Sequence, residues 1–164
     1  MSETKVNLVV ARADNGVIGN KGKLPWRIRS DMHHFRAVTL DKPMIMGRKT
    51  FESLPKLLDR RRHIVLTRDG SWLREGAEVV FDVEEALQAV AGEPEVSVIG
   101  GAEVYRLFLD RADKVWLTRV HTSPEGDAVL PDFNEEIWRQ THFMAGQPTG
   151  QEPDHDFAVL ERRQ

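Results

Sequence analysis

Short apolar runs rich in β-branched residues recur along the chain, each bounded by turn-forming residues. Runs of this length and composition are typical of β-strands. We expect strands at Lys5–Ala13, Pro43–Gly47, His63–Thr67, Glu78–Phe81, Glu95–Ile99, Lys114–His121, Ile137–Ala145 and His155–Arg163.

Helical spacing of apolar residues occupies several of the intervals between these runs. In the clearest case Ser30 is placed to cap the helix and Asp31 lies in its first turn. Because strands alternate with short helices until about residue 121, we expect a mostly parallel sheet that ends in an antiparallel pair. The predicted fold is an α/β sandwich of about eight strands and four helices. The helices are expected at Ser30–Leu40, Arg48–Leu54, Val83–Ala91 and Ala102–Leu109.

Three stretches that contain glycine and proline interrupt this pattern at Asp14–Pro25, Ser123–Pro131 and Gly146–Pro153. They are predicted to be loops. Loops of roughly ten residues are long for a compact domain, so we expect them to act as lids or binding loops.

Length and composition narrow the class of protein. A chain of 164 residues is expected to fold as a single domain over residues 1–164. The 23 Lys and Arg residues against 26 Asp and Glu argue against a nucleic-acid or membrane-surface partner. The absence of cysteine excludes disulfides and thiolate chemistry. With only the short apolar run Leu8–Ala11 near the start and no run of about 18 apolar residues, we expect a cytoplasmic protein.

Ligands of open α/β sheets gather beyond the carboxyl ends of the parallel strands, and three such positions carry suggestive residues. Gly47 to Thr50 lead from a strand into a helix with two cations and a hydroxyl, which suits either an anion site or a solvated helix start. Thr67 and Arg68 follow another strand. Gly100 and Gly101 precede a helix, where paired glycines permit close approach of a ligand, or even a cis peptide, but also an ordinary tight turn.

Together these positions would hold the phosphates of a nucleotide cofactor. Arg48, Lys49 and Arg68 would supply charge for an extra 2′-phosphate, which favours NADPH over NADH. Gly16–Leu24 is not a P-loop, because its glycine spacing is one residue too long and Leu24 replaces the Ser or Thr that binds magnesium. A Rossmann glycine motif is also absent after the first strand.

Asp31 is the candidate for acid–base chemistry. On a helix it shares one face with Phe35 and Val38, and an apolar cleft there would raise its pKa. The alternative is that it only complements the helix dipole. The six histidines lack metal-binding spacing, so no metal site is expected. One arginine of Arg60–Arg62 would clamp an acidic group, or the run is a solvated turn, and the spacing leaves this open.

Several blocks, in order and at family spacing, closely resemble bacterial dihydrofolate reductases. They are Gly19 to Trp26, Asp31 with Phe35, Pro43 to Ser53, Ile99 to Gly101 with Val104–Tyr105, and Gly126–Asp127. The resemblance covers Val6 to about Arg162. It implies a monomeric three-layer fold with a central, mostly parallel eight-stranded sheet. It also implies NADPH-dependent reduction of 7,8-dihydrofolate to 5,6,7,8-tetrahydrofolate, with hydride passing to C6 of the pterin and a proton to N5, and binding of antifolate inhibitors.

The resemblance also implies roles for individual residues. Asp31 would hold the pterin and promote protonation, with Thr118 supporting it by a hydrogen bond, and Asn20 to Leu24 would form a mobile loop that shields nicotinamide from water. Gly100–Gly101 matches a non-proline cis peptide. The implied catalytic set is Asp31, Trp26, Leu24 and Thr118. The implied substrate contacts are Val9, Asp31, Met32, Phe35, Arg36, Leu54, Lys56, Arg61, Ile99 and Thr118. The implied NADPH contacts are Ala11, Ile18, Gly19, Asn20, Gly47, Arg48, Lys49, Thr50, Leu66, Thr67, Arg68, Gly100, Gly101, Ala102, Glu103, Val104 and Tyr105.

The chain departs from the family pattern in places. Lys56 to Arg61 replaces a Pro-Leu-Pro-Gly-Arg turn found in many relatives, Val9 stands where isoleucine is frequent, and Leu130 stands where an aromatic residue is common. Two other functions stay open: the related NADPH-dependent pyrimidine reductase of riboflavin synthesis, and a non-catalytic nucleotide-binding module. The constellation of Trp26, Asp31 and Phe35 argues against the pyrimidine reductase.

Overall fold

A computed structural model describes residues 3–164 of the chain. By its internal contacts the chain divides into two compact units, which are described separately. The first unit comprises residues 3–8 and 39–112, and the second comprises residues 9–38 and 113–164.

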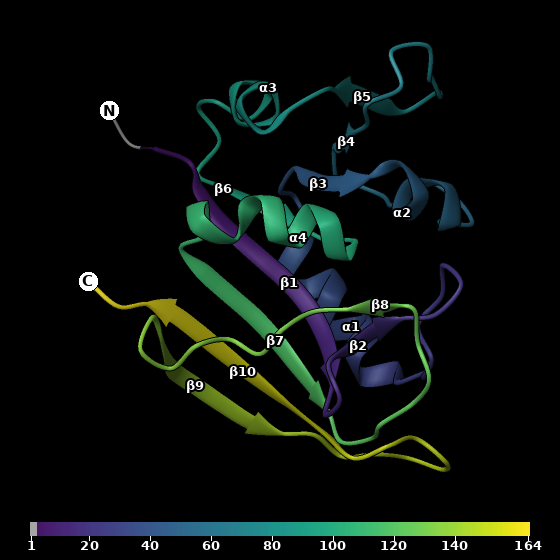
Figure 1. The fold of residues 1–164 in the computed structure, drawn as a ribbon, viewed down its shortest axis with the longest axis vertical. Coiled ribbons are helices and arrows are strands. Elements are labelled where there is room, and N and C mark those ends of the chain that lie inside the picture. Colours follow the sequence, from purple (N-terminus) through teal and green to yellow (C-terminus); the bar gives the residue numbers. More distant parts are fainter. Residues whose placement is uncertain (1–2) are drawn as a thin grey trace. The chain divides into compact units, whose positions relative to one another are not determined.

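An eight-stranded sheet with the order β5-β4-β3-β6-β1-β7-β10-β9 runs through the chain (Figure 1). Its strands are β1 (Lys5–Ala13), β3 (Met44–Gly47), β4 (His63–Leu66), β5 (Ala77–Val80), β6 (Glu95–Val98), β7 (Lys114–Val120), β9 (Trp138–Ala145) and β10 (His155–Arg162). The helices are α1 (Arg29–Thr39), α2 (Arg48–Ser53), α3 (Val83–Ala89) and α4 (Ala102–Phe108), followed by a short 3-10 helix, η1 (Leu109–Arg111).

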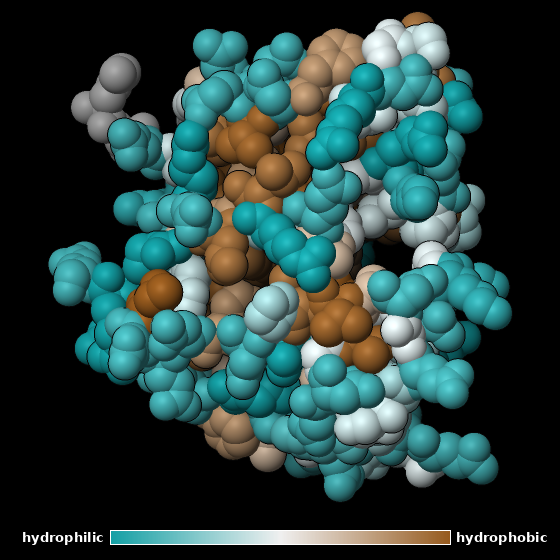
Figure 2. Space-filling view, in the orientation of Figure 1, coloured by the Kyte–Doolittle hydropathy of each residue, from teal (hydrophilic) through white to brown (hydrophobic). Residues whose placement is uncertain are grey.

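The first unit is the parallel part of the sheet with α2, α3 and α4. Strand β6 pairs in parallel with both β1 and β3, and β4 pairs in parallel with β3 and β5. Ile45, Ile64, Val98 and Phe108 are fully buried, as expected for strands covered on both faces. Leu107 of α4 remains 45% exposed, and Figure 2 shows hydrophobic side chains among hydrophilic ones where Figure 1 draws this helix.

The second unit contains the antiparallel part of the sheet. Strand β10 pairs antiparallel with β7 on one side and with β9 on the other. The register sets Phe157 opposite Thr118 and Val159 opposite Trp116. Because side chains alternate between the two faces of a strand, these four residues share one face of the sheet. Contacts from α1 fall on this face, as the site below shows.

The predicted fold class is confirmed: the sheet has eight strands, is mostly parallel and ends in antiparallel strands, with four α-helices. Two further strands, β2 (Val17–Gly19) and β8 (Ala128–Val129), pair with each other inside stretches predicted to be loops. They were missed because strands of three and two residues are too short for an alternating pattern. Several other boundaries differ from the prediction by one or two residues, which is the usual uncertainty at element ends.

The predicted cap of α1 is wrong. The helix begins at Arg29, so Ser30 lies inside its first turn. Its hydroxyl does not cap the helix but lies 3.1 Å from Nε2 of His155. The backbone carbonyl of Ile28 accepts hydrogen bonds from the amides of Asp31 and Met32. The Glu152 carboxylate accepts a hydrogen bond from the amide of Arg29. A side chain distant in sequence therefore satisfies one of the free amides at the N-terminus of α1.

Candidate active site

The carboxyl group of Asp31 lies in the first turn of α1 and faces β7. The Thr118 hydroxyl donates a hydrogen bond of 2.6 Å to its Oδ1. Burial raises the pKa of Asp31 above 3.8, although the Thr118 bond and the positive charge of His34 and His155 act in the opposite direction. A buried carboxyl group with a raised pKa keeps its proton to a higher pH than a free carboxyl group, which suits it to proton transfer.

The face of β7 and β10 described above explains why this turn of α1 is held in place. Three side chains of this part of α1, those of Ser30, Asp31 and His34, contact residues of these strands. Ser30 meets His155, Asp31 meets Thr118, and the ring of His34 packs 4.6 Å from that of Phe157, centroid to centroid. The first turn of α1 is therefore fixed to the sheet by its side chains.

Trp26 precedes α1 and is only 9% exposed. It packs in a cluster with Ala13, Val17, Ile28 and Val120, joined by the partly buried Ala11. The indole Nε1 is buried without a hydrogen-bond partner among residues 3–164. A buried donor without a protein partner is the kind of group that a bound ligand or an ordered water satisfies. Two other predicted residues in this region, Leu24 and Met32, are 54% and 55% exposed.

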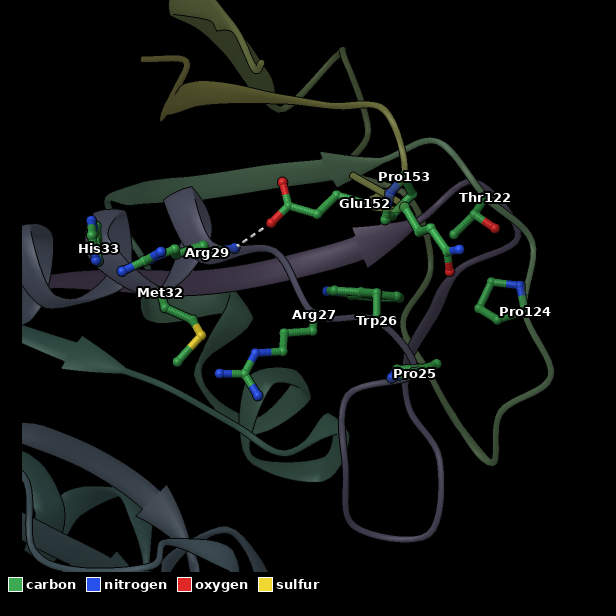
Figure 3. Close-up of a pocket in the computed structure, with 11 residues that line it drawn as sticks. Pro25, Trp26, Arg27, Arg29, Met32, His33, Thr122, Pro124, Glu152 and Pro153 are labelled. Carbon is green, nitrogen blue, oxygen red and sulfur yellow. Dashed lines mark hydrogen bonds between the residues drawn. The ribbon is translucent and has the colours of Figure 1, made fainter. Parts of the chain in front are cut away.

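A hollow of about 790 Å³ opens beside Trp26 within the second unit (Figure 3). Its lining includes Trp26 and Met32 but not Asp31 or Thr118, so it brings together only two of the predicted site residues. Figure 3 shows the Glu152 carboxylate on the amide of Arg29, with Met32 extending away from it. The rest of the lining is Pro25, Arg27, Arg29, His33, Thr122, Pro124, Gln151, Glu152 and Pro153.

In the first unit, the predicted cofactor positions at the ends of β3 and β6 lie together. The Gly47 amide donates a 2.9 Å hydrogen bond to the carbonyl of Gly100. The Gly100–Gly101 peptide is cis, as the resemblance implied. Gly100 has a φ of +126°, and a Cβ there would lie 3.4 Å from the ring of Tyr105. The positive φ is what favours glycine at Gly100, whereas a Cβ on Gly47 would make a tight contact of 3.2 Å with Val104. The backbone here is open to close approach by a ligand.

The predicted phosphate cations surround this glycine cluster with different partners. Arg48 lies 3.7 Å from Glu52 and 3.9 Å from Asp69, and Arg68 makes a 2.8 Å ion pair with Glu103. The exposed Lys49 has no ion pair among residues 3–164. Exposed ion pairs contribute little free energy, so a phosphate can replace the carboxylate partner of each arginine at small cost. The remaining predicted positions of this unit are Thr50, Leu66, Thr67, Ala102 and Glu103, which lie on or beside α2, β4 and α4.

The three consecutive arginines separate into two kinds. Arg60 and Arg62 are part-exposed and pair with Asp41 and Glu78, and these partners raise the pKa of both guanidinium groups. The side chain of Arg61 is only 3% exposed, and it donates to the Thr39 hydroxyl at 3.1 Å. It also donates hydrogen bonds to the carbonyl and the carboxylate of Asp59 within its own turn. Of the three, Arg61 is the one built into the interior.

The unusual turn before Arg61 is held by a histidine. The Leu58 amide donates a 3.0 Å hydrogen bond to Nε2 of His63, which is buried. Burial lowers the pKa of His63, and the neutral ring is the form that accepts this bond. Lys56 and Leu54 flank the turn, with Lys56 exposed and Leu54 partly buried.

The other predicted positions are distributed as follows. In the second unit, Val9 and Ala11 lie on β1, Ile18 and Gly19 on β2 with Asn20 directly after it, and Phe35 and Arg36 on α1. In the first unit, Ile99 directly follows β6 and is partly buried. Val9 and Ile18 are buried, whereas Arg36 is exposed.

Sequence reasoning missed the part played by three histidines. His34 and His155 support the turn of α1 that carries Asp31, and His121 bridges two carboxylates, with Nδ1 3.1 Å from Asp14 and Nε2 2.7 Å from Asp156. For His34 a signal existed, because it follows Asp31 by three residues on a helix. The partners of His121 and His155 are distant in sequence, and no local pattern predicts them.

Groups of three or more His, Cys, Asp or Glu side chains placed to hold a metal ion do not occur among residues 3–164. Within the same range, every helix is too short or too polar to cross a membrane.

Comparison with known proteins agrees with this geometry. The family model described as dihydrofolate reductase matches residues 5–162. A type 3 dihydrofolate reductase of Salmonella typhimurium is 39% identical over 141 residues, which cover 84% of this chain and 87% of that protein. The dihydrofolate reductase of Haemophilus influenzae is 40% identical over 159 residues, with coverage of 96% and 98%.

The fold is similar to that of a solved structure as well. The dihydrofolate reductase of Enterococcus faecalis, complexed with NADP(H) and RAB-propyl, matches with a TM-score of 0.90 at 30% identity. The match covers 98% of this chain and 97% of the other. Since the family model spans nearly the whole sequence and relatives share it at these identities, the chain belongs to the dihydrofolate reductase family.

Proposed function

We propose that the protein catalyses the NADPH-dependent reduction of 7,8-dihydrofolate to 5,6,7,8-tetrahydrofolate, with Asp31 as the acid that promotes protonation of the pterin. The observation that carries this assignment is the buried Asp31 carboxyl group, whose pKa is raised by burial and which accepts the hydrogen bond of Thr118. The Enterococcus faecalis relative is complexed with NADP(H), which supports the choice of cofactor.

The residues of the first unit suit a dinucleotide phosphate. Gly47 at the start of α2 and Gly100 and Gly101 at the start of α4 present backbone without side chains, and an added Cβ on the first two would contact Val104 or Tyr105. Lys49 and the exchangeable ion pairs of Arg48 and Arg68 supply positive charge nearby. When bound, NADPH supplies the hydride, and we assign to these residues the holding of its phosphates.

The residues of the second unit act on the proton. Ionised Asp31 binds the amino group and ring nitrogen of the pterin. Its protonated form promotes transfer of a proton to N5 through an intervening water. Thr118 keeps the carboxyl group in one orientation by donating to Oδ1. Trp26 and the loop that ends at Leu24, once it closes over the bound ligands, exclude bulk water from the reacting atoms, and the low polarity strengthens the interaction of Asp31 with the substrate.

Substitution of Asp31 tests this assignment. We expect Asp31→Asn to lower the rate of dihydrofolate-dependent NADPH oxidation roughly 10²- to 10⁴-fold at neutral pH, with partial recovery in acid, where substrate is already protonated. The rate is followed by the decay of NADPH absorbance. Asp110→Asn is the control, because Asp110 is exposed on η1. An unchanged rate in Asp31→Asn would refute its role, and activity only on a ribosylaminopyrimidine would replace the proposed substrate.

We infer that the protein works as a cytoplasmic monomer and binds antifolate inhibitors, as the family resemblance implies. Light scattering coupled to size-exclusion chromatography measures the mass in solution directly. A mass of twice 18.7 kDa would contradict the monomer.

A further inference from the structure

His34 is a titratable side chain that the reaction described above does not use. It lies on α1 three residues after Asp31, and residues at this spacing are neighbours on a helix surface. Its ring packs against two aromatic side chains of the sheet, 4.6 Å from Phe157 and 6.0 Å from Trp116 between centroids. Nε2 is buried and has no hydrogen-bond partner among residues 3–164.

This environment is an unusual one for a side chain that serves only as packing. An aromatic or aliphatic residue would fill the same space beside Phe157 and Trp116 without burying an unsatisfied polar nitrogen, which costs free energy. His34 and Asp31 are three residues apart on α1, and the charges of the two side chains interact. The free-energy cost of burying Nε2 is offset if the protonated imidazole is attracted to the Asp31 carboxylate.

On the basis of the reductase function, we propose that His34 is a positioning residue for the proton, which forms with Asp31 a coupled pair that holds one proton between the two side chains. Asp31 remains the group that meets the pterin. His34 acts through it, by competing for the proton on the acidic side of neutrality. Thr118 fixes the orientation of Asp31, and the two aromatic rings fix that of His34.

The electrostatics of the two groups agree with this geometry. Burial lowers the pKa of His34 below 6.5, and the same burial raises the pKa of Asp31 above 3.8, so the two move towards each other. Each attracts the other's charge, which raises the pKa of His34 and lowers that of Asp31. Groups that approach in this way titrate as a pair rather than singly. The other charged groups on this face are His155 on β10 and Lys114, which lies 5.5 Å over the Trp116 ring.

The pH profile of the hydride-transfer rate separates this role from mere packing. Removing His34 leaves the proton to Asp31 alone. Where the pair shares one proton about equally, His34→Gln therefore roughly doubles the protonated fraction of Asp31 on the acidic limb. At high pH the pair holds no proton in either protein, so the two rates converge. In His34→Gln we expect the midpoint of the plot of hydride-transfer rate against pH to move to higher pH. The broad curve of the natural protein should also narrow to the curve of a single titrating group.

The matched control is His142→Gln, which removes an exposed histidine of β9 and is expected to leave the profile unchanged. A uniform loss of rate at every pH in His34→Gln, with an unchanged midpoint, would show a structural role and overturn the coupling. Single-turnover measurements with dihydrofolate and NADPH give the rate of hydride transfer itself. They avoid the product-release step, which limits the steady-state rate of many enzymes.

A second experiment does not depend on catalysis. NMR titration of the His34 ring in the protein without substrate is compared between the natural chain and Asp31→Asn. Loss of the Asp31 charge is expected to lower the pKa of His34, because the carboxylate stabilises the imidazolium. An identical titration in both proteins would refute the pair even if the reductase assignment holds. A lower pKa would support the pair even if dihydrofolate proved not to be the substrate.

Discussion

The hydrogen bond between Thr118 and Asp31 makes stability depend on pH in a way that one substitution exposes. Thr118 is 3% exposed, and its 2.6 Å bond to Oδ1 has the short length of an O–H donor on a carboxylate. Thr118→Val keeps the shape and the packing on β7 but removes the donor. Hydrogen bonds to charged groups contribute about 1.5–3 kcal/mol, and those between neutral groups about 0.5–1.5 kcal/mol.

The free energy lost should therefore be larger when Asp31 is ionised. Because burial raises the pKa of Asp31 in the folded state, the folded protein binds a proton at a pH where the unfolded chain has released it. Stability contributed by this group therefore falls as pH rises through the window above 3.8. Removing the Thr118 donor steepens that fall, by about 1 kcal/mol between the protonated and ionised states.

Urea unfolding followed by tryptophan fluorescence measures this difference as the pH is lowered from 8 towards 3.8. We expect Thr118→Val to lose roughly 1.5–3 kcal/mol at the upper end and clearly less at the lower end. Thr118→Ser retains the hydroxyl and serves as the control, with a smaller loss that does not change with pH. In an Asp31→Asn background the valine substitution should lose its pH dependence. A loss of the same size at every pH in the natural background would refute the reasoning.

Three further predictions concern other parts of the chain. Arg48→Ala combined with Arg68→Ala should weaken NADPH binding much more than NADH binding in fluorescence titrations, and equal losses would reject the 2′-phosphate assignment. Hydrogen bonding to Asp156 raises the pKa of His121, so its stabilisation is complete below pH 6.5 and is lost as pH rises through the raised value; melting temperatures of His121→Gln and the natural protein should converge at high pH. Phe108→Ala empties a site that is 0% exposed and should cost about 3–5 kcal/mol in chemical denaturation, whereas a loss below 1 kcal/mol would contradict its place in the core.

The positions of the main elements were predictable from local pattern. Buried parallel strands such as β3 and β4 read as short apolar runs, and the helices between them have their own spacing. The short strands β2 and β8 were not predictable, because their pairing depends on two loops that are more than a hundred residues apart in sequence. The start of α1 was misjudged for a related reason: Ser30 has the chemistry of a cap but finds a partner in His155 on β10.

The candidate site shows the same division. Sequence alone singled out Asp31, the glycine pair and the cations beside it, because residue type and distance from a strand end carry that information. Residue spacing left open which of three arginines points inward and whether Asp31 does more than complement a helix dipole, and the family resemblance implied Arg61 and a catalytic Asp31. The structure adds that the Arg61 side chain is buried and that burial raises the pKa of Asp31.

Local periodicity and backbone preference thus predict the main strands and helices and the residue types that stand at their ends. Local pattern does not supply the partners. Thr118, 87 residues away in sequence, was implied for Asp31 only by the family resemblance, and the aromatic rings around His34 and the burial of the Arg61 side chain emerge from the three-dimensional structure. Partner choice is fixed when the register of β7 against β10 sets which side chains share a face with α1, and no local sequence pattern encodes that register.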